Sequence, residues 1–184
     1  MNHPFHLCLP TLETFDSERG EFGVFGGTEI DLEYSLYTIS LWESKWKKPF
    51  TEASKAFTQE EEIGLYEAMC LTPGVDKLLW GLLTPPLKKD IFEYMADPMS
   101  ATTVNNRNRR PGRREIITTE IIYYWMSTLN IPYTCEHWHF NRLMKLIEVS
   151  FIKQAPPKKM GKKEAMMQQR DLNAARRAML NTRG

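Results

Sequence analysis

The chain has 184 residues, which is enough for one ordinary domain with a buried core, or for such a domain with additional arms. A hydrophobic content of 42% and a charged content of 26% are typical of a globular protein, and no apolar run is long enough to cross a bilayer. The net charge is +1, but residues 1–35 carry seven acidic side chains and one basic one, whereas residues 151–184 carry nine basic and two acidic ones. Either the two ends attract each other, or the basic end meets an acidic partner.

The cysteines indicate a reducing compartment. Cys8, Cys70 and Cys135 are scattered and form no CxxC pair. The first residues lack the basic and apolar regions of a signal peptide. We therefore expect a cytoplasmic protein without a disulfide framework.

The first 34 residues predict β-structure. Residues 5–9 form a short apolar run, and residues 12–27 combine glycines with an alternating Phe22 and Val24, as in a β-ribbon. No GxxxxGK[ST] phosphate loop is present. In residues 28–34, Ile30 and Leu32 alternate with acidic residues, which predicts a strand with apolar side chains inward and acidic ones outward.

Short helices are predicted next. Ser40 and Glu43 have the spacing of a capping box, for a helix that carries Trp42 and Trp46 in the core and ends at Pro49. Thr58 and Glu61 form a second capping box. Residues 75–83 predict a third short helix or a buried apolar segment, closed by the two prolines at 85–86. Residues 87–95 predict a fourth helix, ended by Pro98.

Residues 114–150 are the best-defined part of the sequence and predict an αα-hairpin. The first helix has the apolar stripe Ile117, Ile121, Trp125 and Leu129, which recurs every four residues. Pro132 ends it, and Thr134 is expected to cap the second helix. The apolar face of that second helix consists of Trp138, Leu143, Leu146, Ile147 and Ser150.

No pattern in the sequence indicates a metal, a cofactor or catalysis. On one continuous helix, Cys135 and His139 lie on one side and His137 on another, at ~100° per residue, so they do not ligate one ion together. The motifs GxSxG and HExxH are absent. We therefore expect a non-enzymatic protein with no metal and no cofactor.

Two basic segments remain as binding candidates. The arginines of residues 107–114 have no aromatic residues between them, so we favour a solvated loop over a nucleic-acid contact or a contact with an acidic protein surface. After the Pro156–Pro157 hinge, residues 162–180 predict a basic helix that needs a partner. The tentative partner-binding residues are Lys158, Lys159, Lys162, Lys163, Arg170, Arg176 and Arg177.

The expected fold is α+β and mostly helical. Its parts are a β-rich arm at 1–27, a mainly helical core domain at 28–152, and a hinge with a basic helical arm at 153–184.

Three blocks of the sequence resemble a family of tailed-phage proteins. They are residues 32–50, residues 114–149, and PPKKM at 156–160 with the basic tail that ends in AMLNTRG. The resemblance spans residues 28–184 and is to the tail assembly chaperones, which are encoded near the tape measure protein. It implies a non-enzymatic helper in the host cytoplasm that binds tape measure and tail tube proteins and is absent from the mature virion. The resemblance does not assign a functional role to any residue of this chain.

Alternatives stay open. The main rival is a structural component of the virion tail or its connector, and the third hypothesis is a nucleic-acid-binding phage protein. We expect no membrane contact, and self-association remains an open alternative.

Overall fold

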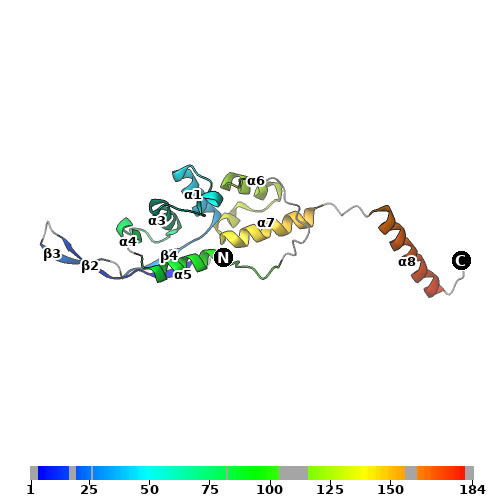
Figure 1. Ribbon diagram of the computed structural model, residues 1–184, viewed down its shortest axis with the longest axis horizontal. Helices are drawn as coiled ribbons and strands as arrows, with labels where there is room; N and C mark the ends of the chain where they lie inside the picture. Colours follow the sequence, from blue (N-terminus) through cyan, green and yellow to red (C-terminus); the bar gives the residue numbers. More distant parts are fainter. Residues whose placement is uncertain are drawn as a thin grey trace. The chain divides into compact units, whose positions relative to one another are not determined.

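The computed structural model describes residues 4–16, 20–25, 27–81, 83–103, 116–155 and 161–180. The fold is α+β and mostly helical, as predicted (Figure 1). Its elements are β1 (Phe5–Cys8), β2 (Leu12–Asp16), β3 (Glu21–Phe25), β4 (Glu29–Leu32), α1 (Leu36–Trp46), α2 (Phe50–Ala53), α3 (Gln59–Met69), α4 (Lys77–Gly81), α5 (Pro85–Ala96), α6 (Thr119–Thr128), the 3-10 helix η1 (Tyr133–His137), α7 (Phe140–Gln154) and α8 (Lys162–Leu180). The chain forms two compact units, residues 1–152 and 153–184.

The strands form two antiparallel pairs, β1 with β4 and β2 with β3. In the first pair Leu7 lies opposite Ile30, and both are buried. The backbone of Leu9 exchanges hydrogen bonds with Thr28 and Gly27 at 3.0 and 3.2 Å, which closes the base of the β2–β3 ribbon. The predicted strand at 28–34 is confirmed, but the outward position of its acidic residues is wrong for Glu33. That side chain is buried, and its Oε1 lies 3.1 Å from Nδ1 of His137.

The larger of two apolar cores lies between the β1–β4 pair and helices α1, α3, α4 and α5. Trp42 is 1% exposed, and its indole N–H donates to the carbonyl oxygen of Glu61 at 2.9 Å. Trp46 packs against the same core from a partly buried position. The prediction that both tryptophans belong to the core is therefore confirmed.

Helix α1 begins earlier than predicted, at Leu36, with Ser35 as its N-cap. The capping box pairs Ser35 with Thr38, not Ser40 with Glu43. Ser40 lies inside the helix and donates to the carbonyl oxygen of Tyr37 at 2.7 Å. The earlier start is favoured because Thr38 satisfies the backbone donor of Ser35, which leaves the Glu43 carboxylate available for longer-range contacts.

Glu43 joins the first turns of two other helices. Its carboxylate is buried and accepts the backbone N–H groups of Phe50 at 2.7 Å and Thr119 at 2.8 Å, together with the Thr119 hydroxyl at 2.5 Å. Phe50 and Thr119 are the first residues of α2 and α6, whose N–H groups have no partner within their own helix. One carboxylate therefore caps both helices and balances the positive ends of their dipoles.

Helices α1 and α3 lie side by side (Figure 1). Helix α3 has the predicted capping box of Thr58 and Glu61. Gly64 makes the close approach possible, since a Cβ atom there would lie 2.8 Å from Nε1 of Trp46. Lys48 bonds to the buried Glu61 carboxylate at 2.5 Å, and this hydrogen bond is the main cause that lowers the pKa of Glu61 below its usual value.

Helices α4 and α5 were both predicted. The two prolines at 85–86 were expected to close the segment before them. They also form the start of α5, because the fixed φ of proline suits the first helical turn. Helix α5 ends at Ala96, before Pro98 as expected. Its buried side chains, Ile91 and Tyr94, belong to the larger core.

The smaller core joins Leu36 of α1 to α6, η1 and α7. Helix α6 buries Thr119, Ile122 and Met126, followed by Leu129. The predicted stripe through Ile121 and Trp125 is therefore about 100° away from the buried face, a difference of one residue along the helix. The prediction is right for Leu129, which is buried, and right in part for Ile117 and Trp125, which pack partly buried against the same core. It misplaces the centre of the buried face because α6 is apolar on adjacent faces, and the contact with α1 and α7 selects one of them.

The predicted second helix of the hairpin is interrupted. Residues 133–137 form the 3-10 helix η1, and α7 begins only at Phe140, so Thr134 does not cap it. His139 makes an isolated antiparallel bridge to Ser35, and the Phe140 N–H donates to the carbonyl oxygen of Tyr34 at 2.9 Å. These contacts with residues before α1 draw the backbone out of helical conformation at Trp138 and His139.

The second unit contains the predicted basic helix, α8. The residues described along its second half are exposed, apart from a half-buried Asn173. Across the described part of the chain, no helix combines the length and apolar character that a membrane span requires.

Candidate protein-binding surfaces

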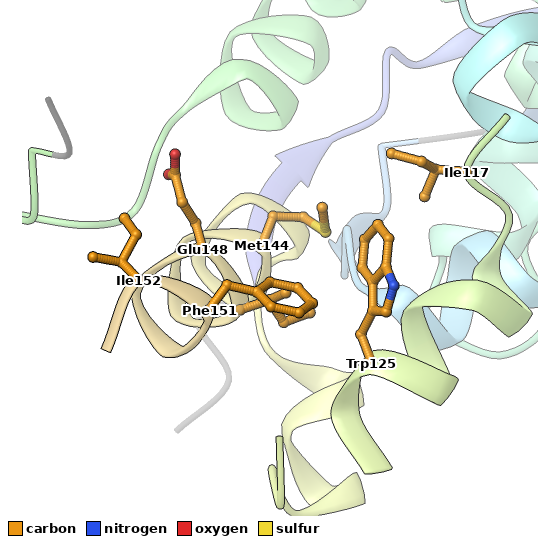
Figure 2. A pocket seen from close by; sticks show the side chains of 7 residues that line it. Ile117, Trp125, Met144, Glu148, Phe151 and Ile152 are labelled. Carbon is orange, nitrogen blue, oxygen red and sulfur yellow. The ribbon is translucent and has the colours of Figure 1, made fainter. Parts of the chain in front are cut away.

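An open apolar groove lies between α6 and the second half of α7 (Figure 2). It has a volume of about 420 Å³. Trp125 enters it from α6, and Ile117 from the residues before α6. The lining residues from α7 are Met144, Ile147, Glu148, Phe151 and Ile152. Six apolar side chains and one carboxylate thus surround a space that the first unit leaves open.

Two aromatic rings meet at the centre of this groove. Trp125 and Phe151 pack edge to face, with ring centroids 5.8 Å apart. Phe151 is 44% exposed and Ile152 is 52% exposed, so this contact leaves much apolar surface in water. Covering such surface with another apolar side chain is favourable by roughly 25 cal/mol for each Å² removed from water.

The groove has one charged lining residue, Glu148. Its carboxylate accepts a hydrogen bond from Nζ of Lys145 at 2.8 Å. In Figure 2 the carboxylate points away from the Trp125 and Phe151 rings. An apolar floor with a polar edge is the usual composition of a protein-binding surface.

Helix α8 is the second candidate surface, and it carries part of the predicted set. Arg170, Arg176 and Arg177 are exposed on it. Lys162 and Lys163 belong to its first turn, with side chains outside the described residues, and Lys158 and Lys159 lie outside the described residues altogether. The helix also exposes apolar side chains that the basic set did not include: Met166, Met167, Leu172, Met179 and Leu180.

The apolar and basic residues of α8 are only partly separated, since Arg176 lies about 40° from Leu172 and Met166 about 40° from Arg170. At ~100° per residue, Leu172 and Met179 share one side, with Ala175 between them. Arg170 and Arg177 share another side, more than a third of a turn away. An isolated helix of this composition is marginal in water, and a partner with an apolar surface and acidic edges would stabilise it.

The three residues of the CxHxH string have separate partners. Cys135 is buried in the smaller core, and burial raises the pKa of its thiol. His137 faces Glu33, and Nε2 of His139 lies 3.0 Å from the carbonyl oxygen of Tyr94. Within the described ranges, no three His, Cys, Asp or Glu side chains are grouped so that they could hold a metal ion.

A polar cluster around His137 is the nearest approach to a chemical site. Tyr123 donates to the Glu136 carboxylate at 2.6 Å, and Glu136 Oε1 lies 3.7 Å from Nε2 of His137. Burial, followed by the neighbouring Glu136, raises the pKa of the Tyr123 phenol far above its usual value. These contacts connect η1 to α6 and to the strand end at Glu33, which gives the cluster a structural role. No local pattern indicates this cluster, because its residues are up to 104 positions apart.

Two further sequence features are the arginine segment and Cys70. The arginine segment 107–114 lies outside the described residues. Cys70, expected to be free of a disulfide, is a partly buried free cysteine, and burial is the main cause that raises the pKa of its thiol.

Comparison of the chain with known proteins found no similar protein. The chain matches no protein-family model, no curated protein and no solved structure.

Proposed function

We propose that this protein is a tail assembly chaperone of a tailed phage, which binds tape measure and tail tube proteins in the host cytoplasm without catalysing a reaction. The observation that carries the proposal is the open apolar groove between α6 and α7. Exposed Phe151 and Ile152 beside Trp125 are suited to holding an apolar segment of a client until that segment is buried in the assembled tail.

Helix α8 supports the same proposal from the other unit. It offers thioether and leucine side chains, which adapt to irregular apolar surfaces, beside three exposed arginines. The resemblance of residues 32–50 and 114–149 to the chaperone family supplies the identity of the client.

The test is co-expression with the tape measure protein of the same phage, followed by pull-down. Phe151→Ala should reduce client capture at least fivefold without loss of folding. Phe92→Ala is the matched control, because both phenylalanines are 44% exposed and Phe92 lies on α5, away from the groove. Equal capture by the two variants would place the client elsewhere.

A second measurement separates the chaperone from the rival hypothesis of a structural tail component. Mass spectrometry of purified particles should find this chain far below the stoichiometry of the tail tube protein. Stoichiometric amounts in the particle would overturn the chaperone proposal and favour the structural one.

A further inference from the structure

A second hollow lies on another face of α7, where the residues after α5 approach that helix. It has a volume of about 200 Å³. Its polar lining consists of Ser100, Thr102, Arg142 and Lys145, and the ring of Trp138 completes one side. None of these residues lines the groove between α6 and α7.

Arg142 is the central cation of this hollow. Its guanidinium carbon lies over the Trp138 ring, 4.4 Å from the ring centroid. Among the described residues, no carboxylate lies within ion-pair distance of this guanidinium, whereas the neighbouring Lys145 is paired with Glu148 at 2.8 Å. A guanidinium that rests on an aromatic ring keeps the N–H donors at its edge free for an anion.

The hydroxyl groups add further donors. Ser100 Oγ accepts the Thr102 N–H at 3.2 Å, which leaves the hydroxyl proton of Ser100 to donate. Thr102 is exposed at the same rim. The hollow therefore combines the Arg142 guanidinium with two hydroxyl groups, while Lys145 is paired with Glu148 and Leu146 and Val149 supply apolar lining. The guanidinium and the hydroxyl groups suit the oxygens of a phosphate group.

The segment that carries these hydroxyls is fixed to α7. Asn141 donates from Nδ2 to the carbonyl oxygens of Met95 and Asp97, both at 2.8 Å. Asp97 Oδ1 in turn accepts the Met99 N–H at 2.7 Å. These bonds hold the chain beyond α5 against the first turn of α7, so the hollow does not require a partner in order to form.

From this geometry we propose that the hollow binds one nucleotide unit of a single-stranded nucleic acid, a role beyond the proposed chaperone function. The phosphate is held by the edge of Arg142 and the hydroxyl groups, and the unstacked base lies on the guanidinium face that is turned away from Trp138. A duplex presents its bases already stacked, and a hollow of about 200 Å³ accepts a single unit at a time. The arginines of 107–114 lie outside the described residues, and the proposed site is defined without them. Their sequence contains no aromatic residue, whereas Arg142 lies over the ring of Trp138.

The test uses fluorescence anisotropy with a fluorescein-labelled oligothymidylate and the full-length chain. Arg142→Ala should weaken binding at least fivefold and reduce the slope of log K against log salt by roughly 0.7, the value for one lost phosphate contact on a single strand. Arg142→Lys should recover the salt slope but only part of the affinity, because it keeps the charge and loses the planar group. Lys89→Ala, at an exposed ion pair on α5, should bind like wild type.

Three further arms decide between ligands. Thymidine monophosphate should compete only at far higher concentration than the oligomer, and a labelled duplex should bind more weakly than the single strand. Equal binding of labelled polyglutamate would overturn the proposal, since the hollow would then recognise charge alone. The proposal also fails if Arg142→Ala binds like Lys89→Ala while the double variant Arg109→Ala/Arg110→Ala abolishes binding. Neither outcome bears on client capture through Phe151.

Discussion

At the scale of single residues, the buried Glu43 connects distant parts of the sequence. Its partners Phe50 and Thr119 are 7 and 76 positions away, and both are first residues of helices. A buried carboxylate is costly unless its oxygens are hydrogen-bonded, and three donors satisfy this one.

Glu43→Ala should therefore destabilise the fold strongly. The substitution leaves two backbone N–H groups and one hydroxyl without their acceptor, at a cost of about 3–5 kcal/mol in the free energy of unfolding. Urea denaturation measures this cost. Glu93→Ala removes a carboxylate that is 66% exposed and should change the same quantity by less than about 0.5 kcal/mol. Similar midpoints for the two variants would contradict the capping role of Glu43.

Trp42 and Trp125 differ in burial, so their replacement should differ in its cost to stability. Trp42→Phe removes a buried indole and its hydrogen bond to Glu61, and should cost about 2–4 kcal/mol. Trp125→Ala removes a partly buried ring that lines an open groove, and should cost only about 1–2 kcal/mol. Thermal melts of the two variants check this order. A larger loss for Trp125→Ala would mean that the predicted stripe on α6 is the true core face.

His139 gives the stability a dependence on pH. Burial is the main cause that lowers the pKa of His139 below 6.5, and the carbonyl oxygen of Tyr94 and the charge of Asp97 only partly oppose it. The unfolded chain then binds the proton more readily than the folded one, so this contribution to stability is present above about pH 6.5 and is lost as the pH falls further. Urea titrations between about pH 7.5 and 5.5 should show stability falling in wild type and falling less in His139→Gln. Parallel curves would exclude His139 as the cause.

At the scale of elements, the contact between α1 and α3 depends on a missing side chain. Alanine is a better helix former than glycine by about 1 kcal/mol, so Gly64→Ala would stabilise an isolated helix. In this fold its Cβ would meet Nε1 of Trp46 at 2.8 Å, so we expect a net loss of about 1–3 kcal/mol. Gly81→Ala on α4 is the control, because its nearest atom lies 3.9 Å away. Chemical denaturation should show a loss for the first variant and no loss for the second.

Most elements with local signals could be predicted from sequence, although the equally local spacing of Ser40 and Glu43 misplaced the start of α1. Features that depend on distant partners could not be predicted. The capping box of Thr58 and Glu61 contains both of its halves within four residues, and α3 begins where it predicts. The face that α6 buries depends on Leu36, and the break before Phe140 depends on Tyr34, both about a hundred positions away. The candidate groove exists because α6 buries a neighbouring face. Ile117 and Trp125, predicted as core residues, therefore line the open groove between α6 and α7.

At the scale of the whole molecule, both apolar cores lie within residues 1–152. Removal of residues 156–184 should therefore leave the melting temperature of the remaining chain within about two degrees of wild type. Client capture should fall, and part of the lost affinity should depend on salt, since exposed charges are screened over about 8 Å at physiological ionic strength. Pull-downs at two salt concentrations measure this. A collapsed melt would assign the segment to the core, and unchanged capture would assign the client to the first unit alone.

The closed base of the β2–β3 ribbon makes it an exchangeable module. Because Leu9 pairs directly with Gly27 and Thr28, the chain leaves the β1–β4 pair and returns to it at adjacent points of the backbone. Residues 10–26 can then be replaced by a short turn, a longer hairpin or an affinity tag without changing where β4 must begin. Related chains should vary in length between residues 10 and 26. An engineered label placed there would leave the groove, the hollow and helix α8 unaltered in sequence.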